Sequence, residues 1–78
     1  MSKRMEVTIE RSQSRTVVRR AGLTSGEEWV MTKTACTYHE WHGGGGEFGN
    51  RPMDECREAL QKAESERWVT EVLGEGDE

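Results

Sequence analysis

The pattern of apolar residues changes along this chain at the four consecutive glycines of residues 43–46. Before them, stretches rich in Val, Ile, Thr and Trp have the composition and alternation of half-buried strands. After them, apolar residues recur at helical spacing. Strands followed by a helix are typical of the α+β class, in which a helix packs on one face of a small antiparallel sheet.

The first twenty residues predict a β-hairpin. Residues 5–11 alternate apolar and polar side chains, as a half-buried strand does. Residues 12–14 are typical of a short turn, and residues 15–21, with Val17 and Val18 at their centre, predict the second strand.

The next segment leaves the number of strands open. Residues 22–26 predict a loop with glycine at both ends, whereas residues 27–42 have strand composition but are long for one strand. Either one long bent strand or two strands with a bulge or turn at residues 32–34 fits this length. We therefore expect a sheet of three or four strands, followed by a flexible glycine-rich loop over residues 43–49.

A helix is predicted after this loop. Asn50 is a good N-cap, and Pro52 suits the first helical turn. One stripe of apolar residues follows at about 100° per residue; it comprises Met53, Cys56, Ala59, Leu60 and Ala63.

The end of the helix has two interpretations. The apolar residues within 67–73 fall on the side opposite the stripe, so either the helix runs to Leu73 with Gly74 after it, or it ends near Ser65 and residues 67–73 form a last strand. We favour the single C-terminal helix, because no Gly, Pro or Asn marks a break. Residues 1–78 then make one small domain with frayed ends at residues 1–4 and 74–78.

The small size and low apolar content predict a thin core. Only 32% of the 78 residues are hydrophobic, so a second subunit or a partner could complete the fold. No apolar run approaches membrane-spanning length, and no apolar segment follows the first basic residues as in a secretory signal. We expect a cytoplasmic protein, and hence Cys36 and Cys56 as free buried thiols rather than a disulfide.

Charge is divided strongly along the chain. Residues 1–20 carry six bases and two acids, whereas residues 50–78 carry four bases and nine acids. Such a chain is expected to present surfaces of opposite sign, which select partners by electrostatics. The predicted partner-binding residues from these segments are Arg11, Arg15, Arg19 and Arg20 in the hairpin, and Glu64 and Glu66 in the acidic helix.

Residues 39–46 predict a binding tip. His39, Trp41 and His42 lie beside the glycine run, and tryptophan is favoured in binding hot spots. The alternative is a plain connection in which Trp41 packs under the helix.

Two chemical functions are weaker alternatives. Cys36, His39, His42 and Cys56 are ligand types for zinc, but their spacing is not that of a standard finger, and a strand would place His39 on the face opposite Cys36. The glycine run lacks the Lys-Ser/Thr of a P-loop. We expect no enzyme activity, because a small open sheet with one helix offers little concave volume for a substrate.

The expected function is therefore non-enzymatic binding of another macromolecule. Small acidic proteins of this gross design are common among phage-encoded inhibitors, including anti-CRISPR proteins that block a guide-RNA complex. By that analogy, the protein inhibits a nucleic-acid-handling complex in a host cytoplasm. The first alternative is a homodimeric nucleic-acid-binding accessory protein that uses the basic hairpin. The second is a small zinc-stabilised module.

Overall fold

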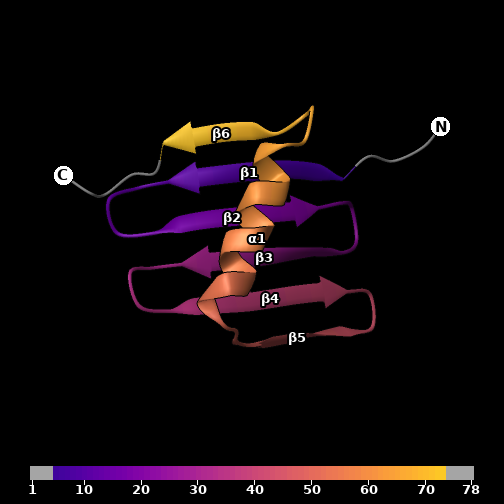
Figure 1. Cartoon of the computed structure of the whole chain (residues 1–78). Coiled ribbons are helices and arrows are strands. Elements are labelled where there is room, and N and C mark those ends of the chain that lie inside the picture. The colour runs from indigo at the N-terminus through magenta and orange to yellow at the C-terminus, as the bar shows by residue number, and fades with distance from the viewer. Residues whose placement is uncertain (1–4, 74–78) are drawn as a thin grey trace.

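A computed structural model describes residues 5–73, which form one sheet and one helix. The elements follow in the order β1 (Glu6–Arg11), β2 (Thr16–Ala21), β3 (Gly26–Met31), β4 (Cys36–His42), β5 (Gly45–Asn50), α1 (Met53–Glu64) and β6 (Thr70–Leu73). The sheet order is β5-β4-β3-β2-β1-β6 (Figure 1). Strands β1 to β5 form an antiparallel meander, and β6 pairs with β1 in parallel. The predicted α+β class, with a helix packed on a mostly antiparallel sheet, is confirmed.

Tight turns at intervals of ten residues define the first four strands. In each turn the first backbone N–H donates to the carbonyl three residues later, from Ser12 to Arg15, from Gly22 to Ser25 and from Thr32 to Ala35, at 2.8–2.9 Å. The Thr32 hydroxyl oxygen also accepts from the Ala35 N–H at 3.1 Å, which stabilises the third turn. Residues 27–42 are thus divided by a turn, as one of the two interpretations proposed.

The expected count of three or four strands is wrong, because residues 5–73 contain six. Part of the difference lies in residues 43–49, which were expected to be a loop. Only residues 43–44 turn, and β5 begins at Gly45. The glycines join the sheet because β4 offers a ladder of backbone partners, from Thr37↔Asn50 to His42↔Gly45, and this pairing needs no side chains.

The helix is shorter than expected and is not C-terminal. It begins at Met53 after Pro52, not after Asn50, which ends β5. It ends at Glu64, where the Ser65 hydroxyl donates to the Lys62 carbonyl at 2.8 Å. The favoured continuous helix to Leu73 is wrong, and the alternative of a last strand is confirmed as β6. The predictions for residues 1–4 and 74–78 lie outside the described residues.

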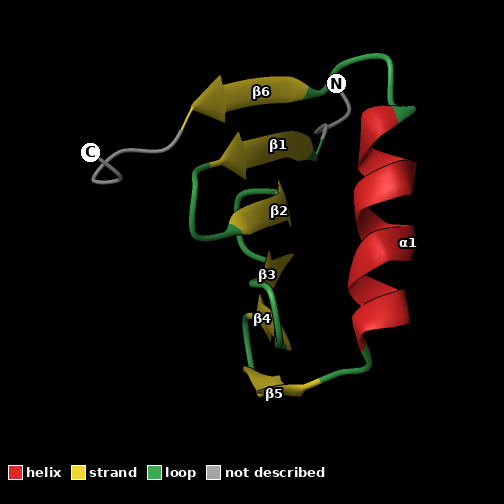
Figure 2. Cartoon of the chain, turned by 60° about the vertical axis from the view of Figure 1, so that its left-hand side comes forward, coloured by secondary structure: helices red, strands yellow, loops and turns green. Residues whose placement is uncertain are grey.

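The helix covers one face of the sheet, crossing the strands from the β5 edge to the β6 edge (Figure 2). Beneath it, Val7, Ile9 and Val18 from β1 and β2 meet Ala63 of α1 in the core, all at most 5% exposed. Trp29, Leu60 and Val69 pack around this cluster. The apolar stripe of α1 therefore packs on the core over β1–β3. No described helix lies over the other face of the sheet.

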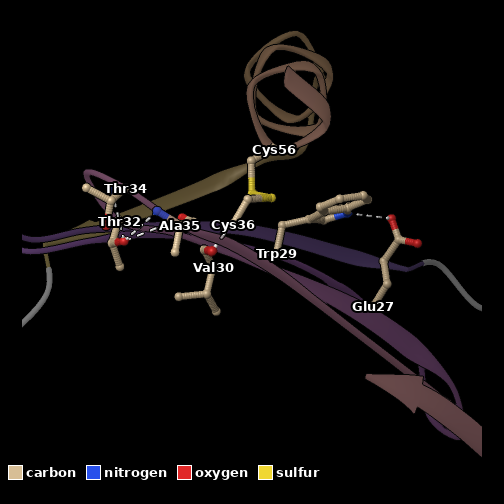
Figure 3. Close-up of a disulfide and its surroundings, with 8 residues drawn as sticks. All are labelled: Glu27, Trp29, Val30, Thr32, Thr34, Ala35, Cys36 and Cys56. Carbon is tan, nitrogen blue, oxygen red and sulfur yellow. Dashed lines mark hydrogen bonds between the residues drawn. A yellow bond between two sulfur atoms is a disulfide. The ribbon is translucent and has the colours of Figure 1, made fainter. Parts of the chain in front are cut away.

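A disulfide joins the helix to the sheet. Cys36 at the start of β4 is bonded to Cys56 of α1, with Cα atoms 6.0 Å apart (Figure 3). The prediction of free thiols is therefore wrong. Both cysteines are buried, as predicted, but the first turns of α1 bring them within bonding distance under the helix, where both are at most 3% exposed.

Candidate functional site

The sheet face opposite α1, called here the uncovered face, carries three clustered aromatic side chains. Side chains alternate along a strand, so His39 and Trp41 of β4 point to the same face, away from Tyr38. In the β4–β5 register His39 lies opposite Phe48. The His39 ring centroid is 5.2 Å from that of Trp41 and 5.6 Å from that of Phe48. We call these three residues the aromatic cluster.

Glycines on both neighbouring strands give Trp41 its place. Trp41 pairs with Gly26 of β3 on one side and with Gly46 of β5 on the other. A Cβ atom at Gly26 would lie 2.6 Å from Cζ2 of Trp41, and one at Gly46 would lie 2.9 Å from the Trp41 Cα atom. Neither position has room for a side chain, so the indole lies across the sheet over Gly26.

Arg19 of β2 extends the aromatic cluster with a cation. Its guanidinium carbon lies 5.1 Å from the centroid of the Trp41 ring, within the range of a cation–π contact. Its Nη1 atom also lies 3.7 Å from a carboxylate oxygen of Glu28. The Arg19 side chain is 53% exposed and Phe48 is 75% exposed, so both present most of their surface to solvent.

The uncovered face is acidic on balance. By strand register its charged side chains within residues 5–73 are Glu6, Glu10, Arg19 and Glu28, which are three acids and one base. Val17 and Val30 pair beside them and continue the apolar surface. The face therefore combines aromatic rings, aliphatic groups and one arginine, with no excess of positive charge.

The oppositely charged segments found in the sequence contact each other. Arg11 Nη2 donates to Glu64 at 2.7 Å, and Arg11 Nε donates to Glu71 of β6 at 3.3 Å. Arg20 Nη1 donates to Glu66 at 3.1 Å. Four of the predicted partner-binding residues thus hold the end of α1 and the start of β6 against β1 and β2. The hydrogen bond to Glu64 is the largest contribution that raises the pKa of Arg11, and Glu71 adds to it.

Of the other predicted bases, Arg15 is exposed beside the first turn and Arg19 belongs to the uncovered face. The predicted tip is divided between faces, because His42 falls on the helix side of β4, three residues from His39. The alternative that placed Trp41 under the helix is wrong, and Trp29 occupies that position.

The four alternative zinc ligands are not brought together. The sulfurs of Cys36 and Cys56 are bonded to each other, so neither is a thiolate ligand. His39 points to the face opposite Cys36. Among residues 5–73, no group of three or more His, Cys, Asp or Glu side chains is placed to hold a metal ion.

The sequence did not predict that two glutamates would meet at a tyrosine hydroxyl on the helix side of the sheet. Glu27 and Glu40 are cross-strand partners, and the Tyr38 hydroxyl donates to Glu40 and lies 3.3 Å from Oε1 of Glu27. Burial of the phenol is the largest cause that raises the pKa of Tyr38 well above its ordinary value, and the nearby carboxylates of Glu40 and Glu27 raise it further. Phe48 was also missed, although its sequence GGEFGN places one large apolar side chain within a glycine-rich strand.

No protein-family model, curated protein or solved structure matches this chain. Within the described part of the chain, α1 is neither long nor apolar enough to cross a membrane, and it is the single helix there.

Proposed function

We propose that this protein is a non-enzymatic binding protein that docks on a protein partner through its uncovered face. One observation carries the proposal: the aromatic cluster and Arg19 lie together on a sheet face that no described helix covers. Tryptophan and arginine are over-represented among the residues that dominate binding energy in protein interfaces. The half-buried Val30, which pairs with the buried Val17, adds aliphatic area to this face.

The balance of charge favours a protein over nucleic acid as the partner. Binding to a phosphate backbone draws mainly on Lys and Arg, whereas this face carries three acids and one base. The whole chain has a formal charge of −4. A partner with a basic rim around an apolar site would complement both features.

The concrete form of this proposal is an inhibitor of a nucleic-acid-handling complex, of the kind that phages encode and that includes anti-CRISPR proteins. It is supported by small size, acidic charge and the α+β architecture, and it assigns the protein to a host cytoplasm. Disulfides are rare in that compartment, but the two sulfurs are buried, and thiol–disulfide exchange requires access to them.

A second candidate is direct binding of single-stranded nucleic acid. Sheet surfaces with exposed aromatic rings stack unpaired bases in several RNA- and DNA-binding folds. Ring centroids 5.2 Å apart along β4 and 5.6 Å apart between β4 and β5 give such a platform, with Arg19 beside it. The acids on the same face act against this candidate.

The test is an affinity capture from host lysate, with and without nuclease, read by mass spectrometry. The bait proteins are the wild type, Phe48→Ser and Leu73→Ser. Leu73 is the matched control, because it is 82% exposed, against 75% for Phe48, and lies on β6 at the opposite edge of the sheet. The proposal expects one stoichiometric protein that survives nuclease, remains with Leu73→Ser and is lost with Phe48→Ser.

Other outcomes separate the alternatives. Partners lost on nuclease treatment, with binding that weakens steeply as salt rises, would replace the proposal with the nucleic-acid candidate. Equal capture by Phe48→Ser and the wild type would refute docking through the uncovered face.

A further inference from the structure

A cleft of about 330 Å³ opens on the helix side, between α1 and strands β2 and β3. Its volume lies at the lower end of the range of small-molecule sites, about 300–1,000 Å³. The sheet contributes Val18 and Trp29, and the helix contributes Ala59, as its apolar lining. The cleft lies on the opposite side of the sheet from the aromatic cluster, so it stands independently of the proposed docking face.

Trp29 is held in place at this cleft. Its ring centroid lies 4.4 Å from that of Tyr38, and its Nε1 donates to Oε2 of Glu27 at 3.5 Å. Figure 3 shows the indole lying below the helix and pointing toward the Glu27 carboxylate. The Tyr38 hydroxyl, which donates to Glu40, lies 3.3 Å from the other oxygen of Glu27. A fixed indole and an oriented carboxylate therefore sit side by side.

The charged lining of the cleft is acidic on balance. Three carboxylates border it, Glu27 from β3 and Glu55 and Glu58 from the helix, against two bases, Arg20 and Lys62. Arg20 is already engaged, since it donates to Glu66, which lies outside the lining, at 3.1 Å. Its Nε atom is 4.0 Å from Glu27, longer than a hydrogen bond, so Glu27 keeps capacity to accept from a ligand.

From these observations we propose that the cleft binds an arginine side chain of a peptide or protein ligand. A guanidinium is planar, stacks on indole rings and donates to carboxylates through several N–H groups. In the cleft it would lie against Trp29, and its N–H groups would reach Glu27 and the helix carboxylates. An ammonium group has the same charge but no planar face to stack, so lysine would bind more weakly.

The test uses the full oxidised chain labelled with ¹⁵N and follows its three tryptophan indole N–H resonances. N-acetyl-L-arginine amide is the probe, and N-acetyl-L-citrulline amide is its neutral isostere; the lysine amide is a third arm. We expect the arginine probe to shift the Trp29 resonance saturably, the lysine probe to shift it with weaker affinity, and the citrulline probe to leave it in place. The Trp29 resonance is assigned by its loss in Trp29→Phe.

Charge variants on the helix surface complete the design. Glu55→Gln and Glu58→Gln should each weaken binding of the arginine probe about twofold to fivefold, the range of partly exposed ion pairs. Asp54→Asn removes the same charge from the same helix outside the cleft and should leave binding unchanged. The Trp41 and Trp68 resonances report whether each variant keeps its fold.

The proposal is overturned if the Trp29 resonance does not move with the arginine probe, or if citrulline moves it equally. It is also overturned if Asp54→Asn weakens binding as much as the two cleft variants do.

Discussion

Reduction of the Cys36–Cys56 disulfide should remove a large part of the stability of this protein. The bridge closes a loop with a sequence separation of 20 residues. In the chain-entropy treatment of the unfolded state, a loop of about 20 residues corresponds to about 3.3 kcal/mol at 25 °C. Domains of this size have free energies of unfolding of about 4–12 kcal/mol, so the bridge accounts for a quarter or more of the total.

The structure also indicates which part of the fold should lose stability first when the disulfide is reduced. Cys56 and Ala63 are the buried residues of α1, and they lie two turns apart. Ala63 packs on the core of β1 and β2, whereas Cys56 holds the first half of the helix to β4. Amide hydrogen exchange in the first half of α1 should therefore accelerate more on reduction than exchange in β1 and β2.

The assay is urea unfolding of the oxidised and the fully reduced chain, followed by tryptophan fluorescence. We expect a loss of about 3 kcal/mol, equivalent to a fall in Tm of about 20 °C for a chain of this length. Cys36→Ser/Cys56→Ser is the control, and its stability should not respond to reductant. Coincident unfolding curves for the oxidised and reduced chains would refute the reasoning.

Three further predictions address the site, the phenol and the ion pairs. Gly26→Ala should lower the free energy of unfolding by about 1–3 kcal/mol, because its Cβ would lie 2.6 Å from Trp41; a wild-type urea midpoint would contradict this. Tyr38, the single tyrosine, should form phenolate only well above its ordinary pKa of 10.0. The raised pKa stabilises the fold fully below pH 10, and stability is lost as pH rises further, because the unfolded chain ionises first. Tyr38→Phe should flatten this alkaline loss in urea titrations, and phenolate absorbance rising at pH 10 in the folded chain would argue against it. Arg11→Met should cost about 1 kcal/mol or less, since Arg11 and Glu64 are 37% and 42% exposed, and the cost should shrink in high salt. A loss of unfolding free energy that does not depend on salt would contradict this and show that Arg11 acts through packing.

Sequence periodicity predicted the elements whose side chains alternate or form a stripe. The strand over residues 5–11, the second strand of its hairpin and the helical stripe from Met53 to Ala63 were all recovered. The turn at residues 32–34 was one of two open interpretations. The ten-residue spacing of the first three turns was the signal that could have decided it, because regularly spaced short strands are typical of a meander.

Two strands had no such signal. In β5, four of the six residues from Gly45 to Asn50 are Gly or Asn, so no alternation shows which face is buried, and backbone pairing with β4 defines the strand. Before β6, no helix-breaking residue marks the end of α1. The reversal of the apolar stripe after Ser65 was the better indicator, because it showed that residues 67–73 could not continue on the same face.

The site was predicted in part. The sequence predicted His39 and Trp41, whereas Phe48 joins them only through the β4–β5 register. The division of charge along the chain was correct as an observation, but the structure places Arg11 against Glu64 and Arg20 against Glu66. Charge segregated along a sequence becomes internal pairing when the fold brings β1 and β2 against the end of α1 and β6, which a linear count does not reveal.

The central claim is that a protein partner docks on the uncovered face, and side-chain footprinting of the captured complex tests it most directly. Hydroxyl-radical oxidation should fall at Trp41 and Phe48 on complex formation and stay unchanged at Leu73, which is exposed on β6, at the opposite edge of the sheet from β4 and β5. Protection of Leu73 or Trp68, with Trp41 and Phe48 oxidised as in the free protein, would contradict the claim and move the interface away from the uncovered face.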